Sequence, residues 1–215
     1  MQNVVLSDTA GAVAYKAAGK VPVRGSHNDI RGVAPAPGWD TRYDWTGWLP
    51  YAQTPQALGA GPQGWLATAN QRIHGAQYPH FLTQDWAAPY RQQRIETLLQ
   101  ATPRHTPSSM QALQADQLSL ATLRLLPVLQ STPSSHPLAA QAQGVLKNFD
   151  AVMRADQAAP LIFTAWVDAL TRQVVGERLG MERFNPLYGK RQFRNALEDL
   201  LERGDKTWCG EAGCT

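Results

Sequence analysis

Two polar residues, Asn70 and Arg91, carry the strongest chemical signal in this sequence. Asn70 ends the run Trp65–Asn70, which is largely apolar and predicts a short strand that is buried on both faces. An Asn in that position can point a neutral N–H donor into a cleft without bringing a charge there. An oxyanion hole needs such a donor, and one donor contributes roughly 3–4 kcal/mol to the stability of the transition state.

Arg91 follows Pro89 and Tyr90 at the start of a predicted helix. Its guanidinium group is permanently charged and presents a rigid fork of donors that can reach back to the end of the strand. The residue types alone do not decide the matter. An Asn at a strand end is more often a turn former, and an Arg on a helix is more often solvated.

Other chemical signatures are missing from the sequence. The histidines show no metal-ligand spacing, and the chain contains no G-x-S-x-G motif, no P-loop and no dinucleotide fingerprint. Asp40 and Asp44 flank Arg42 and predict a solvated charge cluster. Cys209 and Cys214 predict a local disulfide or two free thiols, because a lone C-x4-C without histidine partners is not a zinc site.

Charge and hydropathy exclude two classes of partner. The net charge is only +3, and no run of Lys or Arg accompanies it, so nucleic acid is not an expected partner. No window approaches the ~18 consecutive apolar residues of a membrane span, so no membrane partner is expected.

The elements that must position these residues change in type along the chain. Strands are predicted at Asn3–Ser7 and Ala12–Lys16, joined by a hairpin turn at Asp8–Gly11, with an extended edge at Val21–Val23. Residues 25–64 are irregular, and we expect their three tryptophans to pin this tract by burying large rings.

Helical periodicity begins near Trp86. A helix is predicted after Pro89, another from Thr106 to Pro127, and further ones at Ser134–Phe149, Pro160–Leu179 (with Gly180 as its C-cap) and Lys190–Glu202. Strands followed by helices favour the α+β class over alternating βαβ units. We therefore expect a strand-and-loop part at residues 1–85 and a mainly helical part at residues 86–215.

Several segments, in this order and spacing, resemble the penicillin acylase (penicillin amidase) family of N-terminal-nucleophile hydrolases. They are Val5–Tyr15, Gly19–Arg24, Pro35–Gly38, Tyr43–Pro50, Gly64–Arg72, Tyr78-Pro79, Asp85-Trp86, Pro89–Ile95 and Ala158–Trp166. The resemblance spans nearly the whole chain. It implies that the strands and helices are a fragment of an αββα sandwich.

The resemblance also implies an activity. By position in these motifs, Asn70 matches the side-chain donor of the family's oxyanion hole, and Arg91 matches its active-site arginine. The family cleaves linear amides, such as penicillin, to a carboxylic acid and an amine. A Ser at the new N-terminus of the larger chain of a cut precursor is the nucleophile, and its own α-amino group is the base.

The chain is expected to be an interior fragment of that larger (β) chain, because the motif that carries the nucleophile lies upstream of the hairpin. It is therefore predicted to be inactive alone, to need the small chain and the rest of the large chain as partners, and to self-associate without them. Two alternatives stay open. One is an acyl-homoserine lactone acylase of the same family, and the other is a non-catalytic homologue that acts as an interaction module.

Cofactor and location follow from the resemblance only. Some family members bind calcium, but the acidic position before the arginine is His80 or Phe81 here, and Asp85 is out of register. No cofactor is therefore expected in this chain, and calcium stays possible in the parent protein. The parent protein is expected in the periplasm or outside the cell.

Overall fold

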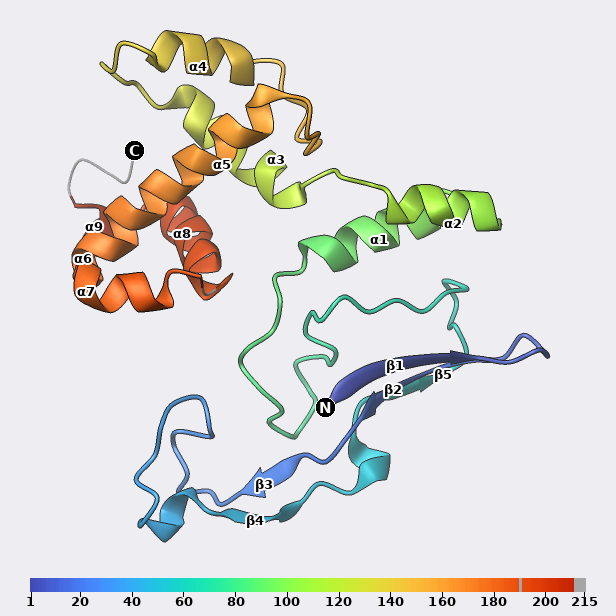
Figure 1. Cartoon of the computed structure of the whole chain (residues 1–215). Coiled ribbons are helices and arrows are strands. Elements are labelled where there is room, and N and C mark those ends of the chain that lie inside the picture. The colour runs from blue at the N-terminus through green and yellow to red at the C-terminus, as the bar shows by residue number, and fades with distance from the viewer. Residues whose placement is uncertain (190, 211–215) are drawn as a thin grey trace. The chain divides into compact units, whose positions relative to one another are not determined.

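The computed structural model describes residues 1–189 and 191–210 of the chain. Two compact units form, Met1–His105 and Thr106–Thr215. Figure 1 shows that the strands belong to the first unit and that most helices belong to the second. This arrangement confirms the predicted α+β class, while the boundary expected at residues 85 and 86 stays a prediction.

The first sheet is antiparallel, with the strand order β1-β2-β5. Strand β1 (Gln2–Ser7) pairs with β2 (Val13–Ala18), which also pairs with the short β5 (Gln56–Leu58). The predicted hairpin is confirmed. Asp8 closes its turn, since its Oδ1 accepts from the backbone N–H groups of Ala10 at 2.9 Å and Ala12 at 2.8 Å.

The second sheet consists of β3 (Pro22–Arg24) and β4 (Trp45–Trp48), paired antiparallel. Two single 3₁₀ turns flank β4, at Thr41–Tyr43 and at Tyr51–Gln53. The predicted charge cluster lies at the first of these turns. Arg42 Nη2 pairs with Asp40 Oδ2 at 2.7 Å at the surface, and the hydrogen bond from Arg42 holds the pKa of the Asp40 carboxyl below its usual value.

The predicted strand at Trp65–Asn70 is wrong. This segment has no regular secondary structure and pairs with no strand among the described residues. Its backbone carbonyls at Ala67 and Ala69 accept hydrogen bonds from side chains of helix α1 (Tyr90–Gln100) instead. Side chains therefore supply the hydrogen-bond donors to these carbonyls that the backbone of a neighbouring strand supplies in a β-sheet.

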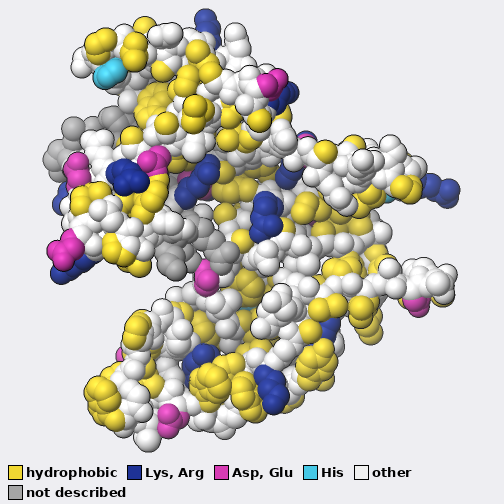
Figure 2. All heavy atoms as spheres, in the orientation of Figure 1, with side chains coloured by type: hydrophobic (Ala, Val, Ile, Leu, Met, Phe, Trp, Pro, Cys, Tyr) yellow, Lys and Arg dark blue, Asp and Glu magenta, His cyan; other side chains and the backbone are white. Residues whose placement is uncertain are grey.

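The expected burial of the tryptophans in the irregular tract is also wrong. Trp39, Trp45 and Trp48 are 88%, 58% and 48% exposed. Trp45 and Trp48 pack edge to face with 5.2 Å between ring centroids, which leaves much of each ring open. Figure 2 shows hydrophobic side chains at the surface of the β3–β4 part of the chain.

A buried polar residue, and not the tryptophans, holds this irregular tract together. Asn28 is 4% exposed, its Oδ1 accepts from the backbone N–H of Arg31 at 2.7 Å, and its Nδ2 donates to the Tyr43 carbonyl at 3.2 Å. Asn is favoured in such turns because its side chain replaces backbone hydrogen bonds.

The second unit is helical. Its helices are α2 (Pro107–Gln114), α3 (Leu120–Ser131), α4 (Ala139–Leu146), α5 (Ala158–Thr171), α6 (Glu177–Leu179), α7 (Met181–Phe184), α8 (Arg191–Arg203) and α9 (Lys206–Cys209), with a π segment at Arg172–Gly176 and a 3₁₀ turn at Asn185–Leu187. Among the described residues, no helix is long and apolar enough to cross a membrane.

The single helix predicted from Thr106 to Pro127 is two helices. Thr106 caps α2 and Ser119 caps α3, each by accepting from a backbone N–H three residues on. Pro127 lies inside α3 and does not end it. The buried side chains of Leu125, Leu126 and Leu129 offset the ~3 kcal/mol that an interior proline costs.

The remaining helix predictions hold in part. The segment predicted at Ser134–Phe149 is helical only at α4. The one predicted at Pro160–Leu179 is α5, the π segment and α6 in succession, and it ends at Gly180, whose φ of +79° suits a C-cap. The last one is α8, and its predicted first residue, Lys190, lies outside the described residues. Cys209 is disulfide-bonded, and Cys214 also lies outside the described residues.

The core of the second unit forms around α5. Phe163 is 1% exposed and stacks at an angle on Phe149, with 6.3 Å between ring centroids. Leu161, two residues earlier on the same helix, is 72% exposed. Substitutions at these two positions therefore separate the effect of losing a buried side chain from the effect of changing a residue within the helix.

We expect Phe163→Ala to destabilise the chain by about 3–5 kcal/mol, since it removes a buried ring and leaves a cavity. Urea unfolding followed by circular dichroism measures the loss. Leu161→Ala is the matched control on α5, and it should stay within about 0.5 kcal/mol of the parent chain. Equal losses in the two variants would contradict this description of the core.

Candidate active site

The backbone at Asn70 has an uncommon conformation. Its φ is +65°, in the left-handed region that Asn tolerates better than most residues. The Asn70 carbonyl accepts from the Ala87 N–H at 3.0 Å, and the preceding Ala69 N–H donates to Gln71 Oε1 at 2.9 Å. These bonds hold a bend at the end of the segment Trp65–Asn70 and leave the Asn70 side chain exposed.

Arg91 determines which way the Asn70 amide faces. Arg91 Nη2 donates to the Ala69 carbonyl at 2.7 Å and to Asn70 Oδ1 at 3.0 Å. A guanidinium group has donors only, so the amide atom beside it is the oxygen. The Asn70 Nδ2 group consequently points away as a donor, and it has no hydrogen-bond partner among the described residues.

Gln92, the next residue of α1, holds the segment at a second point. Gln92 is 6% exposed, and its Nε2 donates to the Ala67 carbonyl at 3.3 Å and to Glu96 Oε1 at 2.8 Å. Ala67 and Ala69 are two residues apart, and their carbonyls accept from the neighbouring side chains of Gln92 and Arg91. One helical turn of α1 therefore holds both carbonyls.

The first sheet holds the same segment through side chains. Tyr15 on β2 donates its hydroxyl to Asn3 Oδ1 at 2.8 Å, and Asn3 Nδ2 on β1 donates to Thr68 Oγ1 at 2.8 Å. Burial raises the pKa of Tyr15 to about 12. Hydrogen bonds from a helix and from a sheet thus hold Ala67–Asn70 in place.

The structure brings together the two residues that the sequence singled out, Asn70 and Arg91. It adds three that sequence reasoning missed: Gln92, Asn3 and Tyr15. The signal for Gln92 is its position directly after Arg91 on a helix whose next turn carries Glu96. For Asn3, the only signal is a polar residue within a predicted strand.

The arrangement can do one thing chemically, which is to donate a hydrogen bond. It offers a neutral amide donor on Asn70, held in position by the Arg91 guanidinium group, at a bend in the backbone. Such a preorganised donor suits an oxygen that becomes negatively charged during a reaction, because little reorganisation is needed when the charge develops.

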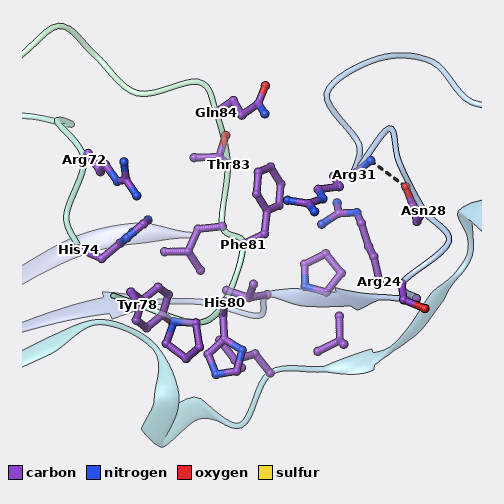
Figure 3. A pocket seen from close by; sticks show the side chains of 18 of the residues that line it. Arg24, Asn28, Arg31, Arg72, His74, Tyr78, His80, Phe81, Thr83 and Gln84 are labelled. Carbon is purple, nitrogen blue, oxygen red and sulfur yellow. Dashed lines mark hydrogen bonds between the residues drawn. The ribbon is translucent and has the colours of Figure 1, made fainter. Parts of the chain in front are cut away.

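His80 and Phe81, one of which is expected from the resemblance to stand at the family's acidic calcium position, line a cavity of about 670 Å³ in the first unit (Figure 3). The charged side chains on its wall are those of Arg24, Arg31 and Arg72, and no carboxylate lines it among the described residues. Calcium prefers oxygen ligands, above all carboxylates. These residues do not fit calcium, and the described part of the chain holds no cluster of three metal-ligating side chains.

Comparison with known proteins identifies relatives of this chain. The family model for penicillin amidase matches residues 1–215. The chain is 33% identical over 187 residues to penicillin acylase 2 proenzyme of Pseudomonas sp., and 31% identical over 199 residues to acyl-homoserine lactone acylase QuiP of Pseudomonas fluorescens. Each alignment covers 84% of this chain and 23% of the relative. The chain therefore spans about a quarter of the length of the curated relatives it matches.

A solved structure supports the fold. The thermostable penicillin G acylase from Alcaligenes faecalis superposes with a TM-score of 0.64 over 87% of this chain and 35% of that chain. The sequence identity is 20%, so this similarity concerns the fold alone. It agrees with the expected N-terminal-nucleophile αββα architecture.

Because of the Tyr15 hydroxyl, we expect the free energy of unfolding to depend on pH in the alkaline range. Because the folded chain raises its pKa to about 12, from about 10 in an unfolded chain, the fold favours the neutral phenol. This contribution is complete below pH 10 and is lost as the pH rises from 10 to 12. The free energy of unfolding, measured with urea at each pH, should fall over that range.

Tyr15→Phe is the control for this effect. It lacks the ionisable group, so its stability should fall less between pH 10 and 12 than that of the parent chain. At neutral pH it should be about 1 kcal/mol less stable, because the hydrogen bond to Asn3 is lost. Parallel curves for the two proteins above pH 10 would show that Tyr15 does not titrate as argued.

Proposed function

Because this chain belongs to the penicillin amidase family, we propose that it is the oxyanion-binding part of an acylase that hydrolyses a linear amide. The substrate is an N-acyl compound, and the products are a carboxylic acid and an amine. One observation carries the proposal: the hydrogen bond from Arg91 Nη2 to Asn70 Oδ1, which leaves Asn70 Nδ2 as the outward donor.

The proposed reaction has two steps. A serine hydroxyl attacks the amide carbon, an α-amino group takes the hydroxyl proton, and the carbonyl oxygen becomes an oxyanion that Asn70 Nδ2 stabilises. The C–N bond then breaks, the amine leaves with the proton, and an acyl ester remains on the serine. Water cleaves this ester through a second oxyanion at the same donor and releases the acid.

Arg91 is a positioning residue in this scheme. It lies behind Asn70, bonded to Oδ1 and to the Ala69 carbonyl, so its charge acts through the amide. An amide polarised at its oxygen is a better donor at its nitrogen, because hydrogen bonds in a chain strengthen one another. Arg91 thus fixes the direction of the Asn70 donor and increases its strength.

The nucleophile is proposed to lie in another part of the polypeptide. The chain spans 23% of the length of its penicillin acylase relative, which is named a proenzyme. We accordingly propose that the serine comes from the processed precursor, that the small chain and the rest of the large chain are partners, and that the 215 residues alone do not hydrolyse amides.

Two acyl donors fit this proposal. The similarity to penicillin acylase 2 proenzyme favours penicillin, and the nearly equal similarity to acyl-homoserine lactone acylase QuiP favours an acyl-homoserine lactone. Asn70 and Arg91 act on the amide group that both substrates share, so the mechanism is the same for each. A homologue without activity, acting as an interaction module, remains the competing hypothesis.

No cofactor is proposed for this part, since the serine with its α-amino group, the Asn70 amide and water supply the groups that the proposed reaction uses. The periplasm or the extracellular space is proposed as the location. The disulfide at Cys209 supports it, because disulfides persist in oxidising compartments.

In the complete precursor, Asn70→Ala should lower kcat by about 10²–10³-fold with maturation largely intact, as expected for the loss of one oxyanion donor. The measurement is turnover of a penicillin and of an acyl-homoserine lactone, together with gel analysis of precursor cutting. Gln77→Ala is the control, since Gln77 is exposed in the same unit and should leave turnover unchanged.

Arg91→Lys tests the positioning role in the same assay. A lysine keeps the charge but not the fork, so kcat should fall while KM changes little. Arg104→Lys, at an exposed position, is its control. Undiminished turnover in Asn70→Ala would end the assignment, and absence of turnover in the unmodified precursor would favour the interaction module.

We also propose that the 215-residue chain self-associates through the apolar surface around β4. Trp39 and Trp45 are 88% and 58% exposed there, and large apolar patches on a soluble chain usually meet a partner. Sedimentation velocity should show a mass that rises with concentration. The double variant Trp39→Ser with Trp45→Ser should shift the chain towards monomer, whereas Leu138→Ser, also at an exposed position, should not. A monomer at every concentration would refute the proposal.

A further inference from the structure

The cavity of about 670 Å³ in the first unit is strongly basic. Figure 3 shows Arg24 and Arg31 on one side of it, beside Phe81, and Arg72 with His74 on the other side. No Asp or Glu is among the described residues that line it. The positive charge of the wall is therefore not neutralised locally.

The three guanidinium groups form no ion pair with any described residue. Arg31 lies over the ring of Phe81, with 5.5 Å from Cζ to the ring centroid. Arg24 packs against the backbone of Gly32, where an added Cβ would come within 2.7 Å of Arg24 Nη2. Both contacts are made by the guanidinium groups themselves, whose N–H donors form no hydrogen bond with another described residue.

The loop that carries Arg31 is built to hold it in place. The buried Asn28 accepts from the backbone N–H of Arg31 at 2.7 Å, and Arg31 itself has a φ of +53°. A non-glycine residue in this conformation is strained, and strain persists where the surroundings determine the geometry, often at binding sites. The backbone of Arg31 is thus preorganised, which lowers the entropy that a ligand must overcome.

The opposite part of the wall is aromatic. Tyr78 contacts His74 with 4.8 Å between ring centroids and His80 with 5.5 Å, and His74 contacts Trp86 with 5.7 Å. The Tyr78 hydroxyl donates to the Gln53 carbonyl at 2.8 Å, which fixes the ring. A flat, apolar body would pack on this surface.

We propose that this cavity binds a small carboxylate whose body is apolar and about as large as an aromatic ring. Arginine recognises a carboxylate through two parallel hydrogen bonds, and the ring cluster accepts the body of the ligand. The cavity volume lies within the roughly 300–1,000 Å³ of small-molecule sites. The proposal does not depend on the proposed catalytic reaction, so binding tests it independently of turnover.

The test is a titration of the 215-residue chain with benzoate and with its neutral isostere benzamide, followed by isothermal calorimetry. Benzoate should bind at least about tenfold more tightly than benzamide, and its affinity should fall as salt concentration rises. A glutamate-rich peptide tests whether the cavity binds carboxylates of a polypeptide instead of a small free acid. Tighter binding of the peptide than of benzoate would assign the site to an acidic segment of polypeptide, and the reverse order to a small acid.

Variants locate the binding. Arg24→Gln and Arg31→Gln should each weaken benzoate binding by about tenfold or more, and Arg31→Lys should keep part of it. Arg42→Gln is the control, because Arg42 pairs with Asp40 at the surface of the same unit and does not line the cavity. Unchanged circular dichroism spectra confirm folding. Equal affinity for benzoate and benzamide, or equal losses in Arg31→Gln and Arg42→Gln, would overturn the proposal.

Discussion

The candidate site depends on one physical constraint: a guanidinium group can donate hydrogen bonds but cannot accept them. Arg91 therefore bonds to oxygen atoms only, and it bonds to two of them, the Ala69 carbonyl and Asn70 Oδ1. The first bond holds the backbone and the second orients the side chain. From these two bonds it follows that a nitrogen donor faces outward at Asn70, with no charge of its own and with a cation behind it.

The rest of the first unit supplies the framework for that constraint. Residues Ala67–Asn70 have no strand partner among the described residues, so their polar groups need other partners, since an unpaired buried backbone group costs free energy. Gln92 bonds to the Ala67 carbonyl, and Asn3 bonds to Thr68 Oγ1. Because side chains replace a ladder, the segment is free to bend at Asn70 where a strand in a sheet would continue. The bend is what presents the donor.

Sequence reasoning reached the types of the elements and the pair Asn70 and Arg91, because each depends on local signals or on motif order. It failed where a long-range contact decided the outcome. Trp65–Asn70 has the composition of a buried strand, but its partners are side chains of a helix more than twenty residues on. Pro127 reads as a helix end, but the burial of its leucine neighbours in the second unit outweighs the local penalty. The tryptophans read as anchors, but the buried Asn28 holds that tract and the rings remain exposed.

Arg91 and the three arginines of the cavity differ in what their guanidinium groups face, and the difference has a physical basis. The guanidinium of Arg91 bonds to oxygen atoms of the chain itself, so its charge serves to hold a structure. Those of Arg24, Arg31 and Arg72 face a cavity without an anionic partner among the described residues. Like charges that line one cavity repel one another, and solvent and salt reduce this cost only in part. The fold holds Arg31 on a strained, preorganised loop and so retains the repulsion between the cavity arginines. An anion that enters the cavity would relieve this repulsion.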